Sequence, residues 1–105
     1  MELDLSEEGA GGGRKQESIM VLFFAAARER AGVNEERWLL AEAPRLDLLK
    51  AGLFERYPAL VPLDAYLRWA VNERFVGPEA FSAEEGALSL QNGDRIALIP
   101  PVSGG

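Results

Sequence analysis

The sequence predicts an α+β roll, in which a mixed β-sheet is covered on one face by one main helix. Residues 19–24 and 95–99 are among the most apolar segments, and they open and close the part of the chain with dense structural signals. Such runs are typical of strands buried in the middle of a sheet, so we expect the first and last strands to be neighbours. Between them, Leu46, Leu49 and Leu53 recur at helical spacing and predict the covering helix. The predicted domain spans residues 19–99.

A short helix is expected directly after the first strand. Residues 25–31 are mostly good helix formers, and Gly32 is placed to end them in a left-handed conformation. Residues 36–41 are expected to form the second strand.

The main helix is predicted to lie between two prolines. Pro44 breaks the chain before the helix and Pro58 stops it. The residues at its start include no polar side chain of the kind that favours a helix N-cap. Gly52, inside the helix, lowers its intrinsic stability and predicts close packing against a neighbour.

The second half of the domain is predicted to contain three strands and one irregular stretch. We expect strands at residues 66–71, 74–76 and 95–99, with turns at residues 72–73 and 92–94. Residues 77–90 show no regular pattern, and Phe81 and Leu88 within them are expected to pack beneath the domain.

The composition excludes several classes of function. The chain has 105 residues, 48% of them hydrophobic, which is enough for one domain with its own core. Its 17 acidic and 11 basic residues give a net charge of −6, which argues against nucleic-acid binding because phosphate backbones favour clustered positive charge. The absence of Cys and His excludes disulfides, cysteine nucleophiles, Ser–His triads and the usual zinc sites. We expect no metal or cofactor on this chain, and a reactive group that is unusual or belongs to a partner.

Residues 1–18 differ in composition from the rest. They hold five acidic residues against Arg14 and Lys15, and four glycines between positions 9 and 13. Such a stretch buries too little apolar surface to order itself, so we expect a disordered leader. It lacks the apolar run of a secretory signal, and no segment is apolar for long enough to span a bilayer. We therefore expect a cytoplasmic protein without a membrane partner.

Residues 100–105 are predicted to form a flexible C-terminal tail. Pro100 and Pro101 cannot continue a sheet, and they favour an extended backbone. Gly104 and Gly105 have no Cβ atoms, so the end of the chain can enter a channel too narrow for side chains. The α-carboxylate of Gly105 is the candidate reactive group, but an ionised carboxylate accepts a nucleophile only after activation, for example as an acyl-adenylate. A sulfur nucleophile can then leave a thiocarboxylate there. Terminal glycines also occur in inert tails, so a plain binding domain is an alternative.

Three segments carry a resemblance to a known family. Residues 93–105, with their Pro-Pro-Val-Ser-Gly-Gly ending, closely resemble the C-terminus of the small, sulfur-carrying subunits of molybdopterin synthase. The resemblance extends to residues 21–25 with Arg28, Glu29 and Gly32, and to residues 70–72 followed by residues 75–76. It covers residues 18–105, except that residues 77–91 look longer than the usual connection. The family implies a ubiquitin-like β-grasp fold.

The resemblance also implies a mechanism. Gly105, with Gly104 beside it, would be adenylated by a ubiquitin-activating-like adenylyltransferase that consumes ATP, and a sulfur donor enzyme would supply the thiocarboxylate. The tail would insert into a large catalytic subunit, within a heterotetramer of two small and two large subunits. There the sulfur would pass to cyclic pyranopterin monophosphate and build molybdopterin.

A partner-binding surface is expected on the outward face of the sheet. Neighbouring strand residues point to opposite faces, so the inward packing of Val21 and Phe23 would turn Leu22 and Phe24 outward. The resemblance places partner contacts at seven positions: Phe24, Phe75, Ile99, Pro100, Pro101, Val102 and Ser103. The alternative is that the segment around Phe81 covers the apolar patch internally. Three arginines add either a basic strip beside the tail or ordinary exposed positions: Arg68, Arg74 and Arg95.

Two further functions remain open on the sequence. A ubiquitin-like modifier would be attached through Gly105 to lysines of target proteins. A related sulfur carrier would serve thiazole synthesis or tRNA thiolation instead of molybdopterin.

Overall fold

The computed structural model describes residues 16–101. In chain order these residues form β3 (Ser18–Phe23), α1 (Ala25–Ala31), β4 (Glu35–Leu39), α2 (Leu46–Arg56), the 3₁₀ segment η1 (Pro58–Tyr66), β5 (Arg68–Val71), β6 (Arg74–Val76), the 3₁₀ turns η2 (Pro78–Phe81) and η3 (Ala83–Glu85), and β7 (Arg95–Ile99).

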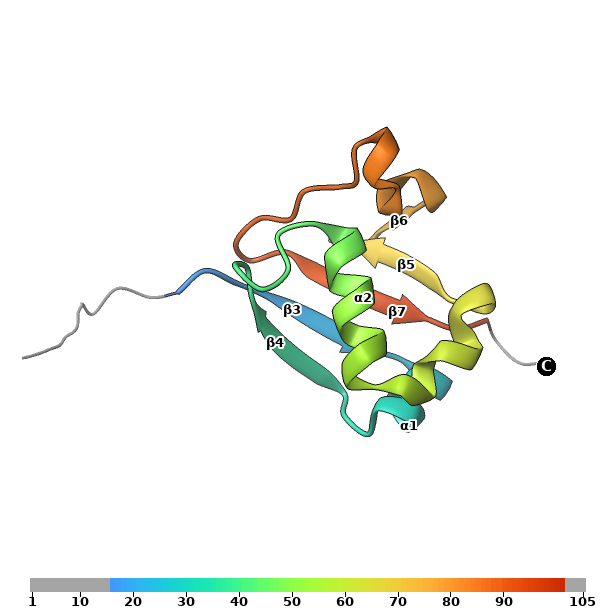
Figure 1. The fold of residues 1–105 in the computed structure, drawn as a ribbon. Helices are drawn as coiled ribbons and strands as arrows, with labels where there is room; N and C mark the ends of the chain where they lie inside the picture. The colour runs from blue at the N-terminus through green and yellow to red at the C-terminus, as the bar shows by residue number, and fades with distance from the viewer. Residues whose placement is uncertain (1–15, 102–105) are drawn as a thin grey trace, which may run out of the picture.

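The five strands form one mixed sheet in the order β4-β3-β7-β5-β6. The first and last strands, β3 and β7, are parallel neighbours, and every other pair is antiparallel. Helix α2 crosses one face of this sheet, with η1 beside its C-terminal end (Figure 1). The arrangement confirms the predicted α+β roll and the β-grasp fold, with adjacent first and last strands and one main covering helix.

The core lies between α2 and the sheet. Leu46, Leu49 and Leu53 of α2 are fully buried, as are Ile96 and Leu98 of β7. Within the helix, a Cβ atom at Gly52 would lie 3.0 Å from two ring carbons of Trp38 on β4. The prediction of close packing at this glycine is therefore confirmed.

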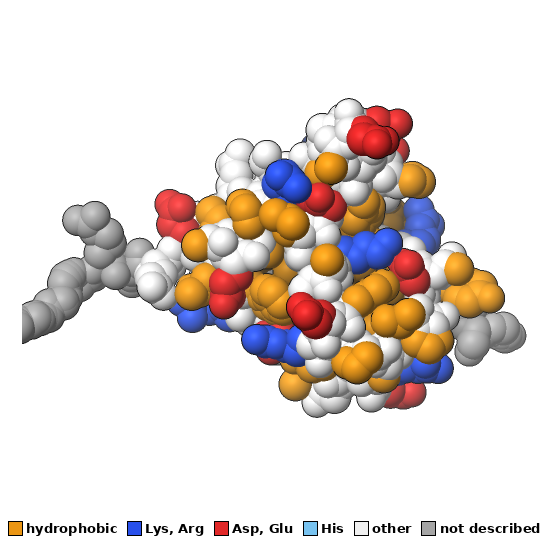
Figure 2. Space-filling model, viewed as in Figure 1, with side chains coloured by type: hydrophobic (Ala, Val, Ile, Leu, Met, Phe, Trp, Pro, Cys, Tyr) orange, Lys and Arg blue, Asp and Glu red, His pale blue; other side chains and the backbone are white. Residues whose placement is uncertain are grey.

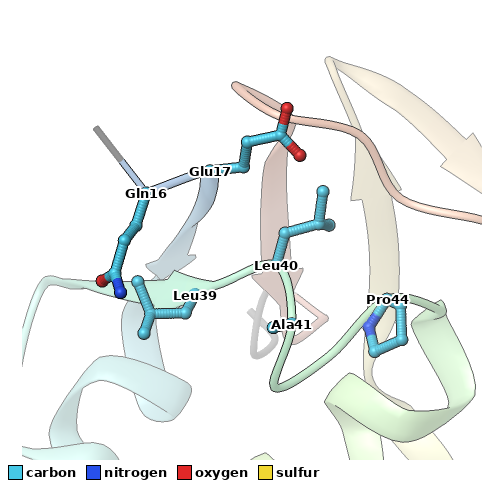
Figure 3. Close-up of a pocket in the computed structure, with 6 residues that line it drawn as sticks. All are labelled: Gln16, Glu17, Leu39, Leu40, Ala41 and Pro44. Atoms are coloured by element: carbon cyan, nitrogen blue, oxygen red, sulfur yellow. The ribbon is translucent and has the colours of Figure 1, made fainter. Parts of the chain in front are cut away.

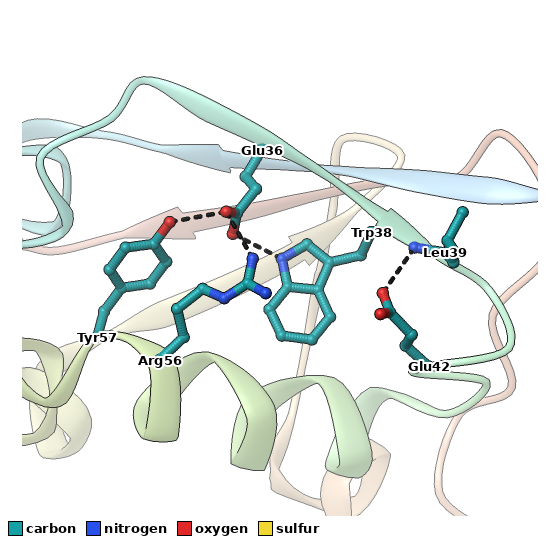
Figure 4. Close-up of polar contacts among 6 residues, drawn as sticks. All are labelled: Glu36, Trp38, Leu39, Glu42, Arg56 and Tyr57. Atoms are coloured by element: carbon teal, nitrogen blue, oxygen red, sulfur yellow. Dashed lines mark hydrogen bonds and ion pairs between the residues drawn. The ribbon is translucent and has the colours of Figure 1, made fainter.

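A polar cluster joins the edge strand β4 to the end of α2 (Figure 4). The Glu36 carboxylate accepts hydrogen bonds from Trp38 Nε1 at 2.8 Å, Arg56 Nη1 at 2.7 Å and Tyr57 Oη at 2.8 Å. The Arg56 guanidinium also lies over the Trp38 ring, 4.9 Å from its centre. Burial, followed by the hydrogen bond to Glu36, raises the pKa of Tyr57 above its ordinary value.

Four local expectations differ from the structure. The second strand, expected at residues 36–41, spans Glu35–Leu39. The strand expected at residues 66–71 begins only at Arg68, because η1 continues to Tyr66. The expected burial of Leu88 is wrong: its side chain is 36% exposed, whereas Ala87 and Leu90 are buried. At the N-terminal end, Ser18 is the first residue of β3 and the Glu17 carbonyl accepts a hydrogen bond from the Leu40 amide at 2.9 Å. Residues 1–15 of the expected leader lie outside the described residues.

Candidate docking face and C-terminal tail

The tail begins where the central strand β7 ends. Along this strand Ile96 and Leu98 point into the core, and the alternation continues to Pro100, whose side chain is buried. Pro100 is thus part of the domain in the free chain, rather than an exposed contact. Pro101 is exposed, and Val102, Ser103, Gly104 and Gly105 lie outside the described residues.

An apolar row crosses the sheet on the face away from α2. The strand register aligns Leu22 of β3 with Ala97 of β7, Ala97 with Ala70 of β5, and Ala70 with Phe75 of β6. Small side chains in the middle of this row and larger ones at its ends produce a groove. Its floor is formed by Ala70 and Ala97 and is called the alanine floor below. The groove is lined by Leu22, Phe24, Ala70, Glu73, Phe75, Arg95, Ala97 and Ile99.

The two aromatic residues that form the walls of this groove are unusually exposed. Phe24 is 45% exposed and Phe75 is 56% exposed, while Ile99, the last residue of β7, is partly buried. The structure therefore brings together the three apolar residues predicted to contact partners. An exposed apolar patch of this kind commonly marks an interaction site.

The segment around Phe81 does not cover the groove. The Phe81 ring packs edge-on against Trp69, with 5.2 Å between the ring centres. Trp69 is buried, and it pairs with the inward-pointing Leu98. Phe81 thus lies on the α2 side of the sheet, and the alternative of an internal cover for the patch is wrong.

Charged residues border the groove. The guanidinium of Arg68 lies over the Phe75 ring, 3.9 Å from its centre, and Arg68 pairs with Ile99 in the sheet. Arg95 and Glu73 line the groove itself. Arg74 pairs with Val71, and hence with the inward row that contains Ile96. Of the three arginines considered from the sequence, Arg95 therefore lines the groove, Arg68 borders it through Phe75, and Arg74 belongs to neither position.

The sequence analysis missed the alanine floor. Ala70 and Ala97 are inconspicuous in the sequence, and only the strand register shows that they are neighbours. The period-2 alternation of β5 and β7 places each of them on the outward face, but cannot align one strand with the other.

A second groove lies at the other end of the sheet, where β3 begins and β4 ends (Figure 3). It is lined by Gln16, Glu17, Leu39, Leu40, Ala41 and Pro44. The chain enters β3 here and leaves β7 at the opposite end of the molecule (Figure 1). This groove is therefore remote from the tail.

The face that carries α2 is mixed. Acidic and basic side chains are interspersed on it, and hydrophobic side chains gather over the C-terminal end of α2 and η1 (Figure 2). Within residues 16–101 no three His, Cys, Asp or Glu side chains are grouped so that they could hold a metal ion. In the same range, no helix is long and apolar enough to cross a membrane.

Comparison with known proteins finds relatives by sequence and by structure. A molybdopterin synthase sulfur carrier subunit of Chlamydomonas reinhardtii is 38% identical over 87 residues, which cover 83% of this chain and 98% of the relative. A solved structure from Pyrococcus furiosus, described as a putative molybdopterin converting factor, subunit 1, is 29% identical, with a TM-score of 0.65 over 82% of this chain and 99% of that one.

A further structure, from a complex of subunits 1 and 2 of molybdopterin-converting factor from Helicobacter pylori, has a TM-score of 0.58. At 23% identity, over 84% of this chain and 99% of that one, it shows a shared fold. The sequence pattern of the ThiS family matches residues 21–105, which include every strand from the middle of β3 and the Gly-Gly end. The chain therefore belongs to the ThiS family.

Proposed function

We propose that the chain is the sulfur carrier subunit of a molybdopterin synthase and that Gly105 carries the sulfur as a thiocarboxylate. The observation that carries this proposal is the route of the C-terminus: the chain leaves the central strand beside the apolar groove, passes the exposed Pro101 and ends in Gly-Gly. Membership of the ThiS family and the name of the 38% identical relative support the same assignment.

Activation starts at the α-carboxylate of Gly105. A ubiquitin-activating-like adenylyltransferase joins this carboxylate to the AMP part of ATP, and pyrophosphate leaves. Hydrosulfide supplied by a donor enzyme then attacks the carbonyl carbon, so a C–S bond forms while the C–O bond to AMP breaks; AMP leaves and the thiocarboxylate remains. ATP is consumed on the activating enzyme, and the carrier itself needs no cofactor.

Transfer takes place in the large catalytic subunit. The groove between Phe24 and Phe75 docks on that subunit, and residues 101–105 reach its active site. The thiocarboxylate sulfur attacks a side-chain carbon of cyclic pyranopterin monophosphate and displaces an oxygen substituent there. Water then cleaves the bond between this sulfur and the carbonyl carbon of Gly105, which restores the carboxylate. The working complex contains two small and two large subunits. The pairing of a small with a large subunit is supported by a solved complex of subunits 1 and 2, one chain of which shares this fold.

Removal of Gly105 tests this function directly. The shortened protein is expected to form no molybdopterin when it is mixed with a large subunit, the activating enzyme, a sulfur donor and ATP. Its melting temperature should be unchanged, because among residues 16–101 every buried residue of the core lies at or before Pro100. Product formation at the wild-type rate by the shortened protein would contradict the proposal.

Mass measurement of the protein from its native host separates the remaining alternatives. Replacement of one oxygen by sulfur at Gly105 is expected for a carrier, and a branched peptide that joins Gly105 to a lysine is expected for a modifier. An unmodified end in the presence of the activating enzyme and sulfur donor would favour an inert tail. Reconstitution with the pterin precursor distinguishes molybdopterin synthesis from thiazole synthesis or tRNA thiolation.

A further inference from the structure

Arg68 occupies a special position beside the groove. It is the first residue of β5 and pairs with Ile99, the last residue of β7. Because side chains alternate along a strand, Arg68 shares the open face with Ala70, two positions later. A cation therefore lies next to the apolar groove and close to the point where the tail leaves the sheet.

The Arg68 guanidinium is held in place but lacks an acidic partner among the described residues. Its Cζ atom lies over the Phe75 ring, 3.9 Å from the ring centre, and this cation–π contact restrains the group. Among residues 16–101 the ion pairs of arginine join Arg45 to Asp47 and Arg56 to Glu36. Arg68 forms no ion pair and no side-chain hydrogen bond within this range, although the chain as a whole has an excess of acids. Its N–H donors are thus available to another molecule.

Burial of the groove changes the free energy of this cation. A partner that covers Phe75 with apolar surface also removes water from the guanidinium stacked on it. A buried cation without an acceptor is strongly unfavourable, whereas a carboxylate can accept two parallel hydrogen bonds from guanidinium. A wholly apolar partner surface would therefore be penalised at this position.

We infer that Arg68 binds a carboxylate on the protein that docks in the groove. It thereby selects a partner that presents an acidic side chain next to the apolar side chain that packs on Ala70 and Ala97. The inference rests on the proposed function, because the large subunit is taken as this partner. Arg95 also lines the groove, but together with Glu73, and it lies at the opposite end of β7 from Ile99, the residue that pairs with Arg68. Arg68 is a specificity residue of the docking face and takes no part in the chemistry at Gly105.

Binding measurements on the full chain and a purified large subunit test the inference. Arg68→Leu is expected to weaken binding at least about tenfold and to reduce its dependence on salt, because it leaves the partner's carboxylate unpaired. Arg68→Lys keeps the charge without the planar fork, so it should give an intermediate affinity. Arg74→Leu makes the same charge change on the neighbouring strand but in the inward row, and should change affinity less than about twofold. Unchanged melting temperatures would verify that all variants are folded.

Substitution of the large subunit's acids identifies the partner residue. Each carboxylate on its docking surface is changed to the amide and combined with Arg68→Leu in a double-mutant cycle, and one of them should show coupling. Equal affinity and equal salt dependence of Arg68→Leu and wild type, with no coupled acid, would overturn the inference alone. Failure of the wild-type chain to bind the large subunit would overturn the proposed function, and this inference with it.

Discussion

Phe75 illustrates how a single side chain can serve binding rather than folding. It stands opposite Ala70 on the last strand of the sheet, is 56% exposed, and supports the Arg68 guanidinium on its ring. Exposed aromatic groups of this size contribute little to core stability, but they are frequent among the residues that dominate interfaces.

Phe75→Lys is therefore expected to separate binding from stability. A lysine removes the wall of the groove and places a second cation beside Arg68, so affinity for the large subunit should fall by about 2 kcal/mol or more. The free energy of unfolding should change by less than about 1 kcal/mol. Titration calorimetry and chemical denaturation measure the two quantities.

Tyr66→Lys is the matched control, since Tyr66 is 63% exposed on η1, outside the groove. It should change neither quantity appreciably. A large loss of stability in Phe75→Lys with little loss of binding would show that Phe75 acts in folding.

At the scale of elements, α2 begins without a polar cap because another segment supplies the hydrogen bond. No side chain caps its first turn, but the Leu46 amide donates to the Leu88 carbonyl at 2.9 Å. Leu90 likewise donates to the Pro44 carbonyl at 2.9 Å, so residues 88–90 lie along the start of the helix. The irregular segment thus satisfies a helix end that looked deficient in the sequence.

Regular elements could be predicted from the sequence because their periods leave a clear pattern. The apolar runs of β3 and β7 and the leucines of α2 gave the correct sheet centre and the correct covering face. Segment η1 was missed because turns of a 3₁₀ helix that contains Pro58 and Pro62 have no long period to detect. Leu88 was misplaced for the same reason, since alternation has no meaning outside a strand.

The burial of Pro100, in contrast, could have been predicted from the sequence. Pro100 continues the inward series of Ile96 and Leu98, so its burial follows from the period of β7. The outward groove required more, because only long-range pairing aligns Ala70 with Ala97.

Because α2 contacts β4 at Gly52, a larger side chain at this position is expected to lower the stability of the fold strongly. Gly52→Val is expected to lower the free energy of unfolding by about 2 kcal/mol. A Cβ atom added at this position would lie 3.0 Å from the Trp38 ring, and the two methyl groups of valine would have to displace the ring. The Trp38 ring is held by its hydrogen bond to Glu36 and by the Arg56 guanidinium, so it cannot move aside easily. Ala51→Val, at an exposed position of the same helix, should cost less than about 1 kcal/mol. If urea denaturation gave equal losses in the free energy of unfolding for the two variants, the contact with Trp38 would not be the cause of the loss.

The junction of α2 with β4 also predicts alkaline sensitivity. Because burial raises the pKa of Tyr57 in the folded protein, the unfolded chain loses this proton first, at about pH 10. The contribution of Tyr57 is thus complete below pH ~10 and is lost as pH rises toward its folded pKa. Tyr57→Phe should be less stable at neutral pH by about 1 kcal/mol, through loss of the Glu36 hydrogen bond, but should lose less stability above pH ~10. Parallel wild-type and variant curves would refute the assignment, and Tyr66→Phe provides the control.

Across the whole molecule, the two ends of the described chain are separated by the length of the sheet. Gln16 precedes β3 at one end, whereas Pro101 follows β7, parallel to β3, at the other (Figure 1). The groove runs along β7 from Arg95 to Ile99 and so reaches the second end, where the tail begins. The proposed docking and transfer therefore use the outward face of the sheet and this end of the molecule.

This separation predicts that residues 1–15 do not take part in sulfur transfer. Their removal is expected to leave both the rate of molybdopterin formation and the melting temperature unchanged, because the described contacts of β3 begin with Glu17 and Ser18. Removal of residues 1–18 is the matched comparison. It deletes the Glu17 carbonyl that accepts from Leu40 and the Ser18 amide that donates to Asn92, and should lower the melting temperature by several degrees. A slower transfer after the shorter deletion, at an unchanged melting temperature, would instead place the leader in the complex with the large subunit.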